Sequence, residues 1–287
     1  MKRKWNVNRK AFASLHLCVV ALIMSYPVAA QSVAVIAPDA SGPAPEYATR
    51  LAEAFPSPIR SIDISMAAAA YAAVAPAQAF NMTTREAMNV GSAVGCDYFV
   101  IVKAATLRRT SFSKPEYYES WAATFTANSR TGTLLNWHFS KFEAATPAEA
   151  ETGLYKSVAA TASEITRSIQ AAAKGSAAVE RTAISELPAD GSPEAKGFRP
   201  PAPYRRIKPE YTSTAYMYDV AATVEVELDL GSDGSILRAE VVRWAGFGLD
   251  ESALAAVRSM NWRPAERNGK TLPIRVLLRY NFKKIDK

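Results

Sequence analysis

The clearest alternation of apolar and polar residues lies in residues 220–230. Apolar side chains occupy every even position there and mostly threonine or acidic side chains the odd ones, a period of two that is typical of a half-buried strand. Residues 231–234 include two glycines that can adopt the positive φ of a tight reversal, and residues 236–244 form a second run of strand length. The pattern predicts an antiparallel hairpin centred on Asp233-Gly234.

A helix and a further strand follow this hairpin. Leu249-Asp250-Glu251 opens the predicted helix, with Asp250 as its candidate N-cap, and Trp262 ends it. Residues 272–282 then alternate again. The positions expected to face inward are Ile274, Val276, Leu278, Tyr280 and Phe282, and those expected to face outward are Arg275, Leu277, Arg279 and Asn281. The predicted order of elements in residues 204–287 is therefore β-β-α-β.

The earlier part of the chain mixes strands and helices. The capping box Thr83-Thr84-Arg85-Glu86 opens one of these helices. The periods predict strands at residues 33–37, 59–66, 97–104, 117–127 and 134–143, and helices at residues 46–55, 67–79, 83–95 and 147–173. We expect residues 31–172 to form a mixed α/β domain around one sheet.

Residues 173–203 are rich in Gly, Ser, Ala, Glu and Pro and have no apolar period, which is typical of a flexible linker. The predicted fold class is α+β with two domains. Residues 31–172 form the mixed α/β sheet domain, and residues 204–287 form the small β-β-α-β domain.

The N-terminus has the layout of an export signal. A basic start precedes a largely apolar run at residues 11–24, and the small residues Val28-Ala29-Ala30 precede Gln31. This layout predicts a signal peptide over residues 1–30 and a periplasmic protein. The alternative is an uncleaved anchor in the inner membrane, because about 20 residues suffice to cross a bilayer.

Charge does not favour a nucleic-acid partner. The formal net charge is +7, but residues 1–30 hold five of the 34 basic residues and no acidic one, which leaves 29 basic against 27 acidic residues. The remainder has no basic stripe interleaved with aromatic residues. We predict no nucleic acid among the partners.

The chain offers little for catalysis or metal binding. Beyond residue 30 it has one cysteine, Cys96, and one histidine, His138, too few for a metal site; Cys96 is expected to be a small core residue. We find no G-x-S-x-G, H-E-x-x-H or G-x-x-x-x-G-K-[ST] motif. The expectation is a protein that is not an enzyme, with no catalytic residue, cofactor, metal or evident small-molecule substrate.

Residues 93–100, a helix end followed by a strand, and residues 124–137, with an Asn-Ser-Arg-Thr-Gly turn, resemble the small α/β domains of TolB N-terminal and CsgG-like envelope proteins. The resemblance covers about half of the first domain. It implies a role in protein contacts or envelope assembly and carries over no catalytic residues.

Residues 198–287 resemble the C-terminal domain of TonB-family energy transducers. The resemblance is carried in order by Lys208-Pro209-Glu210-Tyr211, Ala215, Asp233-Gly234, Leu249-Asp250-Glu251-Ser252-Ala253, Val257-Arg258, Trp262-Arg263-Pro264-Ala265 and Asn268-Gly269-Lys270. In that family the domain grips a segment of an outer-membrane transporter, which adds a strand beside the last strand of the sheet. The resemblance implies the same mode here, with an envelope protein or transporter segment as partner.

The candidate binding residues carried over by position are Tyr211, Arg275, Leu277 and Arg279. An edge strand has unpaired backbone groups that supply affinity, while outward side chains select the partner. The alternative for the arginines is a solvated face that discourages aggregation. A homodimer through the last strand is a further possibility.

A second function stays open, that of a TonB-like energy transducer anchored in the inner membrane. Such a protein needs a stiff, proline-rich segment to cross the periplasm. The segment of residues 173–203 is too short and too poor in proline to be such a segment. We therefore expect a periplasmic protein-binding module that captures a partner segment by β-strand addition.

Overall fold

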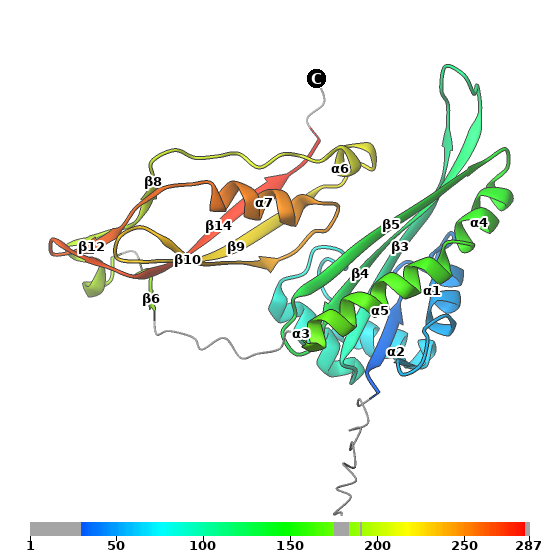
Figure 1. Ribbon diagram of the computed structural model, residues 1–287, viewed down its shortest axis with the longest axis horizontal. Helices are drawn as coiled ribbons and strands as arrows, with labels where there is room; N and C mark the ends of the chain where they lie inside the picture. Colours follow the sequence, from blue (N-terminus) through cyan, green and yellow to red (C-terminus); the bar gives the residue numbers. More distant parts are fainter. Residues whose placement is uncertain (1–29, 175–183, 190, 285–287) are drawn as a thin grey trace, which may run out of the picture.

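The computed structural model describes residues 30–174, 184–189 and 191–284. The predicted signal peptide lies outside the described residues, apart from residue 30. Among the described helices, none combines the length and the apolar character that crossing a bilayer would require. The chain forms two lobes, an N-terminal lobe of residues 30–174 and a C-terminal lobe of residues 184–284 (Figure 1).

The N-terminal lobe is built on a five-stranded sheet in the order β2-β1-β3-β4-β5. Strand β1 runs parallel to both β2 and β3, whereas β3, β4 and β5 are antiparallel neighbours. The strands are β1 Ser32–Ile36, β2 Arg60–Ser61, β3 Tyr98–Arg109, β4 Tyr117–Asn128 and β5 Leu134–Ala144. The helices are α1 Ala44–Glu53, α2 Ile64–Val74, α3 Thr84–Val94, α4 Pro147–Tyr155 and α5 Val158–Lys174.

Most of the predicted elements of this lobe are present, and Thr83 and Glu86 form the predicted capping box. The strand predicted at residues 59–66 is wrong beyond Ser61. Asp63 instead accepts hydrogen bonds from the backbone N–H groups of Ser65 and Met66 and caps helix α2. The alternating Ile and Met residues there resemble a strand, but an aspartate at the N-cap together with the following alanines favours a helix. The helix predicted at residues 147–173 is divided into α4 and α5.

The C-terminal lobe contains a four-stranded sheet in the order β10-β9-β14-β6. Its elements are β6 Ser185–Glu186, α6 Ser213–Met217, β9 Ala222–Leu230, β10 Ile236–Arg243, α7 Leu249–Arg258 and β14 Ile274–Phe282. The predicted hairpin is confirmed, with Gly234 at φ +84° and the Asp233 carboxylate accepting the Ser235 N–H. The fold class is α+β, as predicted.

The segment predicted as a linker is partly structured. Strands β7 Phe198–Arg199 and β8 Ala202–Pro203 pair with β12 Ala265–Arg267 and β11 Trp262–Arg263, and β12 also pairs with β13 Lys270–Leu272. Strand β6 pairs with β14. Strands β6, β7 and β8 are only two residues long, too short to show an apolar period. Their partners lie about 60 to 90 residues further along the chain. Residues 185–203 therefore contribute strands to the C-terminal lobe, and the exact domain boundaries stay a prediction.

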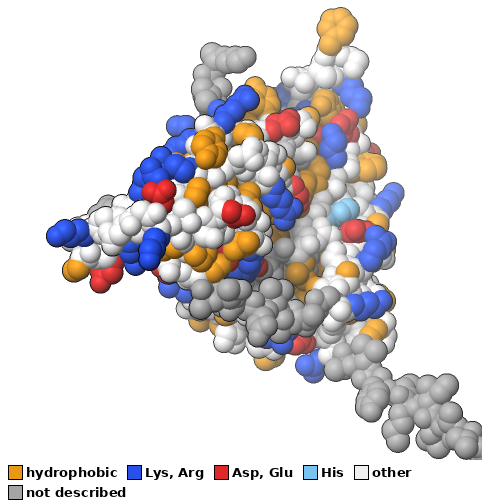
Figure 2. Space-filling view, turned by 60° about the vertical axis from the view of Figure 1, so that its left-hand side comes forward, with side chains coloured by type: hydrophobic (Ala, Val, Ile, Leu, Met, Phe, Trp, Pro, Cys, Tyr) orange, Lys and Arg blue, Asp and Glu red, His pale blue; other side chains and the backbone are white. Residues whose placement is uncertain are grey.

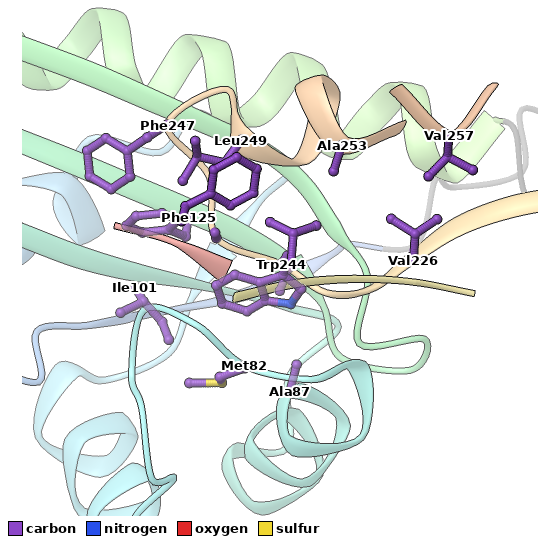
Figure 3. Packing of buried hydrophobic residues seen from close by; sticks show 14 of the residues in the cluster. Met82, Ala87, Ile101, Phe125, Val226, Trp244, Phe247, Leu249, Ala253 and Val257 are labelled. Carbon is purple, nitrogen blue, oxygen red and sulfur yellow. The ribbon is translucent and has the colours of Figure 1, made fainter. Parts of the chain in front are cut away.

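The two lobes share one hydrophobic core. One face of the first sheet packs against α1 and α5, and the other face carries Phe125 and Ile101 together with Trp244, Phe247 and other side chains of the C-terminal lobe (Figure 3). Phe247 is only 2% exposed. Its ring centroid lies 5.7 Å from that of Phe125 and 5.6 Å from that of Trp137. The lobes therefore pack against each other through buried aromatic rings.

Candidate functional site at the edge of strand β14

Strand β14 is the strand on which the predicted binding residues lie. It is fully paired on one side with β9, in an antiparallel register that runs from Ile274–Leu230 to Phe282–Ala222. On its other side, β6 pairs only with Ile274 and Arg275, in parallel. Among the described residues, 276–282 have no strand partner on that side. Seven residues of β14 thus present a sheet edge.

A groove runs beside this edge. It has a volume of about 350 Å³ and is mainly apolar. Its lining comprises Leu187, Pro200, Pro201, Pro203, Arg206, Ile207, Met260, Trp262, Val276, Leu278, Arg279 and Tyr280. Proline has no backbone N–H, so the three prolines of the lining cannot donate hydrogen bonds to the carbonyl oxygens of the β14 edge. An extended segment entering the groove meets backbone donors and acceptors on one side and apolar surface on the other.

Sequence reasoning missed much of this lining, because Leu187 and the three prolines lie in the segment assigned to the linker. A weak signal was available. Residues 198–207 contain aromatic, apolar and proline residues together, in contrast to the Ser, Ala and Glu residues that precede them. Such a composition is more typical of a packed loop than of a solvated linker.

The other face of the sheet carries a charged network. The Arg275 guanidinium donates two hydrogen bonds to Asp229, at 2.7 and 2.9 Å, and the Arg279 Nε donates to Glu225 at 2.7 Å. These pairs follow from the register, which places each arginine opposite its carboxylate on β9. The hydrogen bonds to Asp229 raise the pKa of Arg275 above its ordinary value. The predicted outward direction of the arginines is confirmed.

The two arginine side chains differ in how accessible they are to a partner. The side chain of Arg275 is 22% exposed and that of Arg279 is 62% exposed. Leu277 lies between them and is 52% exposed, opposite Glu227. Leu277 thus offers an exposed apolar side chain within a charged face. Of the four predicted residues, Leu277 and Arg279 are the more accessible on this strand.

Tyr211, the fourth predicted binding residue, lies on the opposite face of the sheet from the arginines. Its ring stacks on Phe282 at a centroid distance of 6.3 Å, and its hydroxyl lies 3.0 Å from the Val220 carbonyl oxygen and 3.2 Å from that of Ala215. Burial raises the pKa of Tyr211. The hydroxyl thus links α6 to Val220, which precedes β9, and the ring packs on Phe282 at the end of β14, on the face opposite to the arginines. A direct role in binding a partner stays a prediction for this residue.

The prediction that Asp250 is the N-cap of helix α7 is wrong. The N-cap is Gly248. The Asp250 carboxylate instead accepts hydrogen bonds from the Ala245 and Gly246 N–H groups, at 2.9 and 2.7 Å. Burial raises its pKa to about 7, although these two hydrogen bonds oppose the shift. The carboxylate therefore shapes the loop that presents Phe247 to the first sheet.

The raised pKa of Asp250 predicts a pH dependence of stability. Between about pH 4 and pH 7 the folded state binds a proton at this carboxyl that the unfolded state releases, so the free energy of unfolding falls as pH rises through that window, by about 1.4 kcal/mol per unit at most. Urea unfolding of the wild type and Asp250→Asn at pH 5 and pH 7.5 isolates this contribution. We expect the difference between the two proteins to change with pH, and a constant difference would contradict the assignment.

Other candidate chemistry is sparse. Cys96 is buried as predicted, and burial raises the pKa of its thiol. Within the part of the chain that the structure describes, no three His, Cys, Asp or Glu side chains gather closely enough to hold a metal ion.

Comparison with solved structures finds low similarity over about half of the chain or less. The hypothetical protein CT253 from Chlamydia trachomatis is 10% identical, with a TM-score of 0.32, over 48% of this chain and 99% of that chain. Lipoprotein GNA1162 from Neisseria meningitidis is 14% identical, with a TM-score of 0.32 and the same coverage. The LpoB C-terminal domain from Salmonella enterica is 12% identical, with a TM-score of 0.27, over 39% and 82%.

No curated protein matches the chain. A family model, in contrast, matches the region that contains β14 and part of the lining of its groove. Residues 207–283 match the model described as Gram-negative bacterial TonB protein C-terminal, and the C-terminal lobe therefore contains a domain of this family.

Proposed function

We propose that this protein is a protein-interaction module of the Gram-negative periplasm. Its C-terminal lobe captures a segment of an outer-membrane transporter or another envelope protein by adding it as a strand beside β14. The observation that supports this most directly is the edge of β14, where β6 pairs only with Ile274 and Arg275 and leaves residues 276–282 without a strand partner among the described residues.

The length of the unpaired edge fits this mode. Residues 276–282 span about 20 Å at roughly 3.3 Å per residue, the length of an average strand. Backbone hydrogen bonds along such an edge supply affinity without regard to sequence, and the apolar groove beside it accepts alternate side chains of the added segment. Specificity then comes from the groove and from the exposed side chains of Leu277 and Arg279.

The charged network limits what the arginines can contribute. Arg275 is already held by Asp229, so breaking that pair to bind a partner carboxylate would leave a buried charge without its principal partner. Arg279 is largely exposed, and its partner Glu225 has Arg243 as a second cation at 3.4 Å. Arg279 is therefore the arginine that can bind a partner without leaving a buried carboxylate unpaired.

The experiment that tests this proposal replaces Leu277 with proline. Proline cannot donate to a ladder, so the full chain carrying Leu277→Pro is expected to lose capture of the envelope proteins that the wild type retains from a detergent extract of envelopes. Leu237→Pro is the matched control, since Leu237 is similarly exposed (58% against 52%) and lies at a bulge on the opposite edge strand, β10. Circular dichroism verifies that both variants are folded.

Hydrogen exchange supplies the second measurement. Binding of a captured protein is expected to slow exchange of backbone amides within residues 276–282. Undiminished capture by a folded Leu277→Pro protein, or binding without slowed exchange at β14, contradicts strand addition. A homodimer through β14 would instead slow exchange in residues 276–282 without any partner, to an extent that increases with the concentration of the protein.

A further inference from the structure

A second groove lies between the two lobes, away from β14. It has a volume of about 400 Å³, and the surface is hollowed between the lobes in Figure 2. Its lining comprises Thr133, Leu134, Leu135, Asn136, Trp137, Ala239, Glu240, Val241, Trp244, Asp250, Glu251 and Leu254. The site we proposed above uses none of these residues.

Two walls of this groove are sheet edges. Strand β5 is the last strand of the first sheet, and β10 is the last strand of the second. Consecutive residues line the groove from each side, 133–137 around the start of β5 and 239–241 in β10. Consecutive lining residues indicate that the backbone itself borders the space, because side chains alternate between the two faces of a sheet. The groove is therefore bordered by two backbone edges available for pairing.

The walls are held in place by contacts between the lobes. The Trp244 indole N–H donates to the Gly132 carbonyl oxygen at 3.2 Å, beside the residues of the β5 wall. Phe247 packs on Trp137, which also lines the groove. A preformed, rigid groove loses less entropy on binding than one that must assemble.

The charges of the lining are of one sign. It contains three carboxylates, at Glu240, Asp250 and Glu251, and no Lys or Arg. Arg238 pairs with Glu240 from outside the lining, and Asp250 is buried and bonded to the backbone. Glu251 is exposed and has no ion pair among the described residues. A cation entering the groove therefore finds Glu251 available and no cation of the lining to repel it.

We propose that this groove binds an extended, cationic segment of a partner protein, which pairs with the backbone edges of β5 and β10 and places a basic side chain beside Glu251. Leu134, Trp137 and Leu254 supply apolar surface for the side chains that alternate with the basic ones. The protein would then hold two strand-like segments, one at each edge of the C-terminal sheet, because β10 and β14 lie on opposite sides of β9.

A synthetic peptide tests this inference with the full chain. The probe is acetyl-Lys-Val-Lys-Val-Lys-amide, whose length matches residues 133–137, and calorimetry at low salt measures its binding. We expect binding that is at least about tenfold tighter than that of acetyl-Lys-Pro-Lys-Pro-Lys-amide, which has the same charge and fewer backbone donors. The anionic peptide acetyl-Glu-Val-Glu-Val-Glu-amide is expected not to bind. Equal affinity for the Val and Pro peptides, or no binding of the Val peptide, overturns the proposal.

Charge reversal tests the position of the site. Glu251→Lys is expected to weaken binding of the Lys-Val peptide by about tenfold. Glu53→Lys is the matched control, because Glu53 is likewise an exposed helical carboxylate without an ion pair among the described residues, at the end of α1. We expect the control to bind as the wild type does. Equal effects of the two variants would indicate attraction by net charge alone and overturn the assignment of Glu251.

Hydrogen exchange distinguishes this groove from the β14 edge. Bound peptide is expected to slow exchange in residues 133–137 and 239–241 and to leave residues 276–282 unchanged. Leu277→Pro, which is expected to abolish capture at β14, should leave binding of the Lys-Val peptide unchanged. Protection confined to residues 276–282 would place the peptide at β14 and refute a second site.

Discussion

Replacing Phe247 with alanine is expected to lower the free energy of unfolding by about 3–5 kcal/mol. The ring is buried and packs against Phe125, Trp137 and Phe139 of the N-terminal lobe, at centroid distances of 5.7, 5.6 and 6.4 Å. Alanine removes these contacts and leaves a cavity between the lobes. Urea unfolding followed by circular dichroism measures the loss.

The backbone around Phe247 supports this prediction. Phe247 has a φ of +54°, and its neighbours Gly246 and Gly248 also have positive φ. A bulky residue rarely adopts the left-handed region, and the conformation is held by Asp250 and by a hydrogen bond from the Thr212 hydroxyl to the Phe247 carbonyl oxygen at 2.6 Å. The loop thus maintains an unfavourable backbone conformation at Phe247, and this conformation directs the ring towards the first sheet.

Phe112→Ala is the control for this variant, because Phe112 is fully exposed in the loop between β3 and β4 and buries no surface. We expect it to change the free energy of unfolding by less than about 0.5 kcal/mol. A loss below about 1 kcal/mol for Phe247→Ala would show that the lobes are stable without this contact. Separate unfolding transitions of the two lobes in Phe247→Ala, against one transition in the wild type, would support a shared core.

Arg275→Ala is expected to destabilise the protein by about 3 kcal/mol, since it removes the principal partner of a buried carboxylate. Asp229 is only 4% exposed, and the other arginine near it, Arg238, lies at 4.0 Å. Arg279→Ala is the matched comparison on the same strand. Glu225 keeps Arg243 at 3.4 Å, so this loss is expected to stay below about 1 kcal/mol. Urea unfolding of both variants at one pH measures the contrast.

A double variant identifies the cause of the Arg275 effect. Replacing Asp229 with leucine and Arg275 with methionine removes both charges from the sheet and keeps comparable volumes. This protein is expected to recover most of the stability lost in Arg275→Ala, because no buried charge is left unpaired. Equal losses in Arg275→Ala and Arg279→Ala would instead mean that Asp229 is solvated well enough to need no cation.

Local patterns predicted the C-terminal hairpin, helix α7 and strand β14, because each places its apolar residues on one face at the period of its own secondary structure. The outward direction of Arg275, Leu277 and Arg279 follows from the same alternation. The capping box of α3 is also local, since its two side chains lie three residues apart.

Other features depend on partners that are distant along the chain. The sequence around β6, β7 and β8 has no strand period, and these short segments become strands only because the C-terminal sheets offer them edges. The pairing of Arg275 with Asp229 depends on which residues of β14 and β9 face each other, a register that neither strand specifies alone.

The sequence by itself therefore determined the elements of the C-terminal domain and the residues of its last strand that face outward. Only the tertiary structure decided which edge of that strand is open, that the lobes share a core through Phe247, and that β5 and β10 border a second groove. The physical reason is that alternation and capping act over a few residues, whereas register, edges and grooves arise from contacts between segments that the chain brings together only on folding.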